Sequence, residues 1–250
     1  MAQDPRVPVC FDVLGTCYSF DGATEKLLTI FPDLSKERAD DIVQDWFHSA
    51  QRDFTYLSMN DSYAPIAQVL KSTLPRIYLM HKLVSSPDQI DSKTMIDPII
   101  SSIPSMPPRP SLIPATKLLA SSKSPKFRLM AATNGGLETT KKLFTNAMGE
   151  DLVKEMAWEF FSCDQDKKAK PDQKVYSDVW KALGKENEGE RKGWFVASHT
   201  WDLHAAKRAG FKTAYVTYEE HLVLEDLFGK PDIVAKDLEE AAKRIIEAES

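Results

Sequence analysis

The chain opens with a short and almost wholly apolar run. Residues 7–13 read VPVCFDV, with β-branched and aromatic side chains, and Gly15 follows them. A run of this length and composition is typical of a strand that is buried on both faces of a parallel sheet. The pattern therefore predicts a central strand that carries Asp12 near its carboxyl end and turns at Gly15.

Helical periodicity replaces the strand pattern over residues 21–103. Between residues 35 and 57 the apolar side chains recur at helical spacing, and the first residue, a serine, suits an N-cap. A second helical pattern covers residues 64–83, and a weaker third one covers residues 88–103. The proline-rich residues 101–114 cannot continue a helix, so we expect a linker there; an interaction motif is the competing interpretation.

After the linker, short apolar runs alternate with helical patterns. The pattern predicts strands at residues 127–132, 158–162, 194–197 and 213–217, and helices from 137 and over 172–183, 202–209 and 237–250. Such alternation indicates βαβ units, whose parallel sheet binds ligands at the carboxyl ends of its strands. The predicted fold class is α/β: a Rossmann-like parallel-sheet core with an inserted helical cap domain after the first strand. We expect the core in residues 1–20 and 105–250 and the cap in residues 21–104.

Composition and charge narrow the class of protein by exclusion. The 250-residue chain has a net charge of -5, whereas proteins that bind the nucleic-acid backbone normally show a basic stripe. No apolar run approaches the ~20 residues that cross a membrane, and the first residues lack the layout of a secretory signal. Three cysteines without metal-site spacing are typical of a reducing cytosol. We expect a cytoplasmic protein that binds neither nucleic acid nor membranes.

Polar side chains follow the predicted strands. A carboxylate such as Asp12 can attack an electrophilic carbon or phosphorus and form a covalent ester, although by itself it could equally cap a turn. Thr133 and Asn134 offer a hydroxyl and an amide that can orient an anion. Lys170 would keep the nucleophile ionised, and Asp202 would orient Lys170 or an attacking water. Their common position at strand ends points to one site.

These residues also carry a resemblance to a known family. The segments FDVLGT, ATNGG, KPDQKVY and SHTWD are similar, in this order, to the four motifs of the haloacid dehalogenase superfamily. Over nearly its whole length the chain resembles the type II L-2-haloacid dehalogenases. The helical insert is similar to their cap, in which the segment QRDFTYL at residues 51–57 matches a helix that faces the active site.

The resemblance implies a hydrolase that works in two steps. Asp12 displaces halide from carbon 2 of a haloacid with inversion, and water then hydrolyses the aspartyl ester at the carboxyl carbon of Asp12. The resemblance also implies supporting residues: Thr16, Lys170, Tyr176 and Asp202 around the nucleophile and the water, Thr133 at the substrate carboxylate, and Asn134 and Trp201 beside the leaving group. A homodimer would agree with the family.

Two positions favour this branch over the phosphatases of the superfamily. Those phosphatases generally carry a second Asp two positions after the nucleophile, whereas this chain has Leu14, which cannot protonate a leaving oxygen. Ser198 stands where they usually place a magnesium-ligating Asp, and one carboxylate fewer holds a hard cation poorly. We therefore expect a reaction without metal or other cofactor on a small carboxylic-acid substrate.

Two departures from the dehalogenases leave the substrate open. His48 stands where they have the cap arginine that cradles the halide, and a neutral imidazole is a weak anion trap. Arg52, one helical turn further on, either replaces that cation or is a solvated surface arginine. Ala197 and His199 stand where the dehalogenases tend to show Ser and Asn.

Alternatives to a 2-haloacid dehalogenase therefore remain. The first is a hydrolase of the same fold with a non-halogenated substrate, in which His48 and His199 form an acid/base pair. The others are a magnesium-dependent phosphatase and a non-catalytic binding protein that keeps the fold. The predicted catalytic residues are Asp12, Thr16, Lys170, Ser198 and Asp202; the predicted substrate-binding residues are His48, Arg52, Thr133, Asn134, Tyr176, His199 and Trp201, with no metal ligand.

Overall fold

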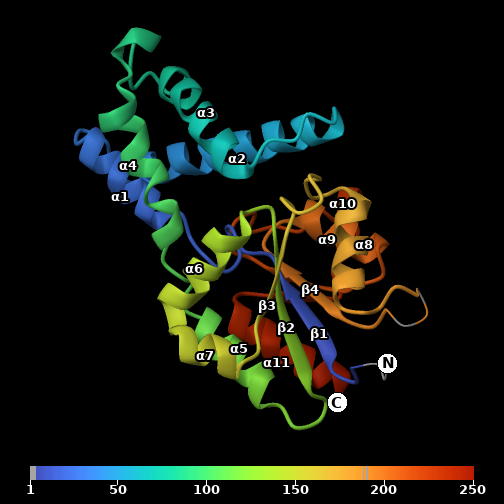
Figure 1. Ribbon diagram of the computed structural model, residues 1–250. Coiled ribbons are helices and arrows are strands. Elements are labelled where there is room, and N and C mark those ends of the chain that lie inside the picture. Colours follow the sequence, from blue (N-terminus) through green and yellow to red (C-terminus); the bar gives the residue numbers. More distant parts are fainter. Residues whose placement is uncertain (1–3, 188, 190) are drawn as a thin grey trace. The chain divides into compact units, whose positions relative to one another are not determined.

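The computed structural model describes residues 4–187, 189 and 191–250 (Figure 1). The chain divides into two compact units. One contains the described residues up to Tyr18 together with Pro108–Ser250, and the other is Ser19–Pro107. Among the described residues, no helix combines the length and the apolar character that a membrane span requires.

The first unit is built on a six-stranded sheet in which every neighbouring pair of strands is parallel. Its strands are β1 (Val7–Phe11), β2 (Phe127–Thr133), β3 (Glu159–Ser162), β4 (Trp194–Ala197), β5 (Lys212–Val216) and β6 (Ile233–Ala235), and they lie in the order β3-β2-β1-β4-β5-β6. The apolar run at the start of the chain is thus a central strand. Val9 pairs with Leu129 on one side and with Trp194 on the other.

Helices cover both faces of this sheet, as the burial of successive side chains along its strands requires. Helices α8 (Gln173–Ala182) and α9 (Thr200–Arg208) pack on the face that presents Cys10 and Phe195. The other face presents Phe11, which contacts Trp158, and Trp158 contacts Phe144. That side carries α5 (Leu112–Ser121), α6 (Leu137–Met148), α7 (Glu150–Glu155) and α11 (Leu238–Glu249); the short α10 (Glu225–Phe228) contacts α9.

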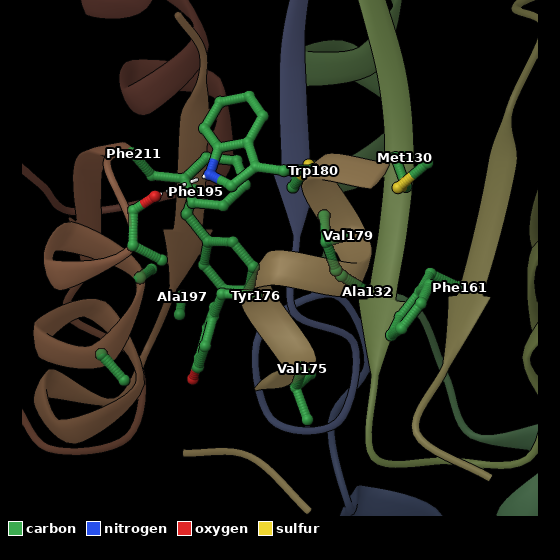
Figure 2. Packing of buried hydrophobic residues seen from close by; sticks show 14 of the residues in the cluster. Met130, Ala132, Phe161, Val175, Tyr176, Val179, Trp180, Phe195, Ala197 and Phe211 are labelled. Carbon is green, nitrogen blue, oxygen red and sulfur yellow. Dashed lines mark hydrogen bonds between the residues drawn. The ribbon is translucent and has the colours of Figure 1, made fainter. Parts of the chain in front are cut away.

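An aromatic cluster fixes α8 on the sheet (Figure 2). The rings of Trp180 and Phe211 stack with centroids 3.8 Å apart, and the Trp180 indole N–H donates to the Ala209 carbonyl at 2.8 Å. The ring of Tyr176, one turn earlier on α8, meets that of Phe195 edge to face. Because these side chains are buried, they hold α8 in one position against the sheet.

The second unit is helical. It contains α1 (Asp21–Ile30), α2 (Lys36–Met59), α3 (Ile66–Met80) and α4 (Asp97–Ile100). The hydroxyl of Ser35 accepts a hydrogen bond from the Arg38 N–H at 3.2 Å and so caps α2, as the sequence predicts. The indole N–H of Trp46 donates to the Leu70 carbonyl at 2.9 Å and ties α2 to α3.

The parallel-sheet core with a helical insert after the first strand is confirmed, but two sequence-based expectations about helices are wrong. Residues 88–103 do not form one helix; they form short turns at Pro87–Gln89, Ser92–Ile96 and Ile103–Ser105, with α4 between them. Three of these four elements have a proline at their first or second position, where its missing N–H costs nothing, so each proline starts a new element. The linker also ends earlier than predicted, because α5 begins at residue 112.

Candidate active site

The site lies where the order of the strands reverses. In the order β3-β2-β1-β4-β5-β6, successive strands run outward from β1 in one direction and from β4 in the other. A parallel sheet of this kind binds ligands at the carboxyl ends of the strands at that switch point. Asp12 directly follows β1, and Ser198 directly follows β4. The backbone N–H of Asp12 donates to the Val196 carbonyl at 2.9 Å, which joins the two strand ends.

Lys170 bridges the two predicted carboxylates. Its Nζ lies 2.6 Å from Oδ1 of Asp12 and 2.6 Å from Oδ2 of Asp202. All three side chains are buried, with 1% of Lys170 and 9% of Asp12 exposed. The ammonium also lies 5.2 Å from the ring centroid of Phe195, in the aromatic cluster below α8. Asp12 and Lys170, which are 158 positions apart in the sequence, therefore meet with Asp202 in one buried ion-pair network.

The pKa values of Lys170 and Asp202 in this network are shifted. Burial by itself lowers the pKa of Lys170, but the charges and hydrogen bonds of Asp12 and Asp202 outweigh burial and raise the pKa above its ordinary value. The amine is therefore a permanent cation. Burial raises the pKa of Asp202 to about 6, against the opposing effect of Lys170. The hydroxyl of Tyr176 donates to Oδ1 of Asp202 at 2.5 Å and supports its ionised form.

A tight turn brings Thr16 back onto the nucleophile candidate. The Thr16 hydroxyl donates to Oδ2 of Asp12 at 2.8 Å and accepts from the backbone N–H of Ser198 at 3.0 Å. The hydroxyl of Ser198 lies 3.0 Å from the hydroxyl oxygen of Thr16. Gly15 allows this return because its φ is +84°, a backbone conformation that residues other than glycine rarely adopt. The turn thus holds Asp12 between Thr16 on one oxygen and Lys170 on the other.

The segment after β2 supplies the predicted anion-orienting groups. The Thr133 hydroxyl accepts from the Gly135 N–H at 2.8 Å, so its own hydrogen remains to be donated to another group. The side-chain oxygen of Asn134, Oδ1, accepts from the backbone N–H of Lys170 at 3.0 Å. The side-chain amide nitrogen of Asn134 therefore points away from that N–H. Both residues are almost fully buried, Asn134 with 9% exposed. The side chain of Asn134 is therefore tied to the segment that carries Lys170.

The remaining predicted residues fall in two places. His199, which is 1% exposed, and the partly buried Trp201 lie at the start of α9, with ring centroids 5.6 Å apart. His48 and Arg52 lie on successive turns of α2 in the helical unit. His48 is exposed. The side chain of Arg52 is half exposed, pairs with Asp53 at 3.2 Å and contacts the Ser49 hydroxyl.

Three residues at this end of the sheet were not among the predicted ones. Glu219 and Glu220 follow β5, and Arg109 is the second residue of the chain's return to the sheet-containing unit. The two acids are a further polar pair just past a predicted strand. The same signal marks Thr133 and Asn134. Arg109 stands in the proline-rich linker, where the sequence pattern gives no hint of a contact with the site.

The fold has close counterparts among solved structures. An L-2-haloacid dehalogenase from Xanthobacter autotrophicus has a TM-score of 0.77 at 20% identity, over 98% of this chain and 100% of that one. A structure of an L-2-haloacid dehalogenase from the same organism with chloropropionic acid covalently bound gives 0.74 at 19% identity, over 96% and 98%. A Bacillus subtilis protein assigned to the HAD hydrolases, with bound magnesium, gives 0.66 at 14% identity, over 98% and 100%.

No protein-family model and no curated protein sequence matches the chain. At identities this low, a structural likeness establishes the fold. Three features agree with that likeness: the order of the strands, the buried acid after β1 and the helical insert that follows this acid in the sequence. The chain has the fold of the haloacid dehalogenase superfamily and resembles its L-2-haloacid dehalogenases.

Proposed function

We propose that the chain is a hydrolase of the haloacid dehalogenase type that forms an ester on Asp12 and acts on small 2-substituted carboxylic acids, with 2-haloacids as the substrate class. One observation carries the proposal. Lys170 contacts both Asp12 and Asp202 at 2.6 Å in a buried network at the switch point of the sheet. The covalent chloropropionic acid complex of a protein with this fold supports the choice of substrate.

In the first step, a carboxylate oxygen of Asp12 attacks carbon 2 of the haloacid. The new carbon–oxygen bond forms as the carbon–halogen bond breaks, and halide leaves with the electron pair. Before the attack, Lys170 donates a hydrogen bond to one oxygen of Asp12, and Thr16 orients the other oxygen. Thr133 has a hydroxyl hydrogen to donate to the substrate carboxylate.

In the second step, water attacks the carboxyl carbon of the Asp12 ester. The bond between that carbon and the substrate oxygen breaks, one proton of the water passes to the departing oxygen, and a 2-hydroxy acid leaves. The second proton of the water is released to solvent, which restores the carboxylate of Asp12. Asp202 stays hydrogen-bonded to Lys170 and to Tyr176 and so keeps the cation in place while Asp12 is esterified. One water oxygen is left in the carboxylate of Asp12.

The side chain two residues after the nucleophile favours halide as the leaving group. An alkoxide leaving group needs a proton donor, and Leu14, which is 8% exposed, offers none. Halide leaves as a stable anion and needs no donor.

Magnesium, which is bound in the Bacillus subtilis structure with this fold, does not fit the residues present here. One oxygen of Asp12 accepts from Lys170 and the other from Thr16, so a divalent ion would have to displace both. Ser198 offers a neutral hydroxyl where a second carboxylate would be needed. We therefore derive no step through a metal.

A substrate panel tests the proposed function. The chain is incubated with 2-haloacids and with phosphate esters, with and without magnesium, beside the Asp12→Asn variant. We expect halide release without magnesium that is absent from the variant. Release of phosphate that depends on magnesium, or silence on both panels, contradicts the proposal. Single-turnover hydrolysis in heavy-oxygen water must place the label on Asp12; a label found only in the product rules out the ester.

A further inference from the structure

Glu219 lies beside His199 at the nucleophile turn. A Cβ placed on Gly15 would come within 3.2 Å of the His199 Cε1 and 3.3 Å of the Glu219 Cγ, so both side chains close on the same turn. A ring nitrogen of His199 and a carboxylate oxygen of Glu219 lie within 4.8 Å of each other. Only 10% of the Glu219 side chain and 1% of His199 are exposed. A buried carboxylate thus faces a buried imidazole.

Arg109 holds this carboxylate in place. Its guanidinium forms an ion pair with Glu219 and donates to the Gly15 carbonyl at 3.0 Å. The same guanidinium lies 4.6 Å from the ring centroid of Tyr218, and the backbone N–H of Arg109 donates to the Cys17 carbonyl at 2.8 Å. A planar guanidinium with several fixed partners has little freedom to release any one of them. Glu219 is therefore pinned at the nucleophile turn.

Glu220 fixes the residue that follows His199. One of its carboxylate oxygens accepts from both the backbone N–H and the hydroxyl of Thr200, at 2.8 and 2.7 Å. Thr200 is the first residue of α9, and a carboxylate at that position stabilises the start of a helix. The two consecutive acids therefore hold the backbone after His199 and the space beside its ring.

Asp202 is less suited to receive the proton of the hydrolytic water. Its two oxygens already accept from Lys170 and from Tyr176. An imidazole next to a carboxylate is the arrangement by which many hydrolases keep a base in one orientation. His199 with Glu219 supplies that arrangement at the turn that carries the nucleophile.

We propose that Glu219, pinned by Arg109, is a positioning residue that orients the His199 imidazole to accept a proton from the hydrolytic water. This inference rests on the proposed function. As water attacks the ester carbon of Asp12, one proton moves to the imidazole. When the tetrahedral centre collapses, the bond to the substrate oxygen breaks and the proton passes from the imidazole to that oxygen. Formation of the ester needs no proton transfer and does not involve the pair.

The test separates the two half-reactions. In Glu219→Gln, hydrolysis of the ester slows while its formation does not. We expect kcat to fall by about 10- to 100-fold, KM to fall with it, and kcat/KM to stay within about twofold. A rapid burst of one halide per chain should precede the slow steady state. Equal losses in kcat and kcat/KM without a burst overturn the inference.

Two comparisons show whether Glu219 acts through His199. In a His199→Asn background, Glu219→Gln should cause no further loss; an additive loss contradicts a shared role. Glu239→Gln is the matched control, because Glu239 lies on α11 in an exposed pair with Lys243. That control should keep the parent's kinetics. The thermal midpoint of each variant checks that it folds.

A measurement without substrate separates this inference from the proposed function. The ring ¹⁵N resonances of His199 are assigned by comparison with His199→Asn and recorded at one fixed pH. Glu219→Gln should shift them, and Glu239→Gln should not. Unshifted resonances overturn the Glu219–His199 contact. If the resonances shift but the parent chain releases no halide from any 2-haloacid, the proposed function fails and the pairing stands.

Discussion

At the scale of single residues, Lys170 is an amine that lies with 1% of its side chain exposed between two carboxylates. Taking a charge out of water costs several kcal/mol unless its partners and hydrogen bonds compensate. Here each carboxylate is hydrogen-bonded a second time, Asp12 by Thr16 and Asp202 by Tyr176. The network is therefore complete only while all its members are present.

Lys170→Met tests this dependence. The change keeps the length of the side chain but leaves two buried carboxylates facing each other without a cation. We expect the free energy of unfolding in urea to fall by about 3–5 kcal/mol and halide release to fall by roughly 100-fold or more. Lys174→Met, at a half-exposed position paired with Asp178, is the control and should unfold like the parent. Equal stability of the two variants would refute the network.

Tyr176→Phe tests the ionisation of Asp202. With a pKa raised to about 6, Asp202 is protonated below that pH, and kcat should fall there. The Tyr176 hydroxyl supports the ionised carboxylate and thus lowers the pKa of Asp202, so its removal should move the acid limb to higher pH. The pKa of Tyr176 itself lies well above its usual range because the ring is buried, so it stays protonated throughout.

The pH profile of kcat measures the shift, with Tyr215→Phe as the control. Tyr215 is a buried tyrosine whose hydroxyl has no hydrogen-bond partner among the described residues. Its removal should leave the acid limb in place. A limb that stays fixed in Tyr176→Phe, or that moves to lower pH, would contradict the assignment.

The sequence predicted which polar residues would lie together wherever such a residue followed an apolar run. Asp12, Thr133 and Asp202 stand just after or near predicted strands, and parallel strands end at one edge. The sequence could not show that Asn134 would accept from the Lys170 backbone, because that contact depends on the path of the segment after β3. Nor could it place Arg109 against Gly15, since no period or motif links them.

At the scale of secondary-structure elements, the turn after β1 decides how the Asp12 carboxylate is presented. Gly15 has a φ of +84° and lies against His199 and Glu219. A side chain here meets two obstacles, the backbone conformation and the neighbouring groups. The turn is therefore specified both by its own geometry and by the segments that follow β4 and β5.

Gly15→Ala separates these two obstacles when it is compared with Gly149→Ala. Gly149 has a similar φ of +80°, but a Cβ there would meet nothing within 4 Å. The strained φ alone should lower the free energy of unfolding by about 1–2 kcal/mol in both variants. Gly15→Ala should lose more, along with most of its halide release, because His199 and Glu219 must move. Equal losses in the two variants would show that the turn tolerates a side chain.

The elements that the sequence predicted best are those with one clear period. Residues 194–197 are a strand over the predicted range, and α2 begins after its serine cap. The third helix of the insert failed because prolines divide it, which only the structure shows as separate turns. Strand β6, with three residues, is too short for a period, and α5 was hidden by the prolines that precede and enter its first turn.

At the scale of the whole molecule, the three cysteines all belong to the unit that contains the sheet. Cys10, Cys17 and Cys163 have no exposed surface. Burial raises the pKa of each thiol above its usual range, to about 12 for Cys163. Since the thiolate is the reactive form, none of them can serve as a nucleophile in the folded protein.

Thiol labelling therefore reports the opening of this unit. We expect a disulfide-exchange reagent to modify no cysteine in the native chain and three per chain in concentrated guanidinium. Lys170→Met, which weakens the same unit, should increase the rate of labelling under native conditions. Rapid reaction of any thiol in the native parent would show that its surroundings open without unfolding.

The pairing of β1 has a consequence for the order in which the chain can assemble. Val7 pairs with Phe127, and Val9 with Trp194, so a ribosome makes the whole helical insert before either neighbour of β1 exists. Until then, this apolar strand has no partner. During synthesis this stretch is the segment most exposed to association with other chains, and a chaperone that shields extended apolar peptides would act on it first.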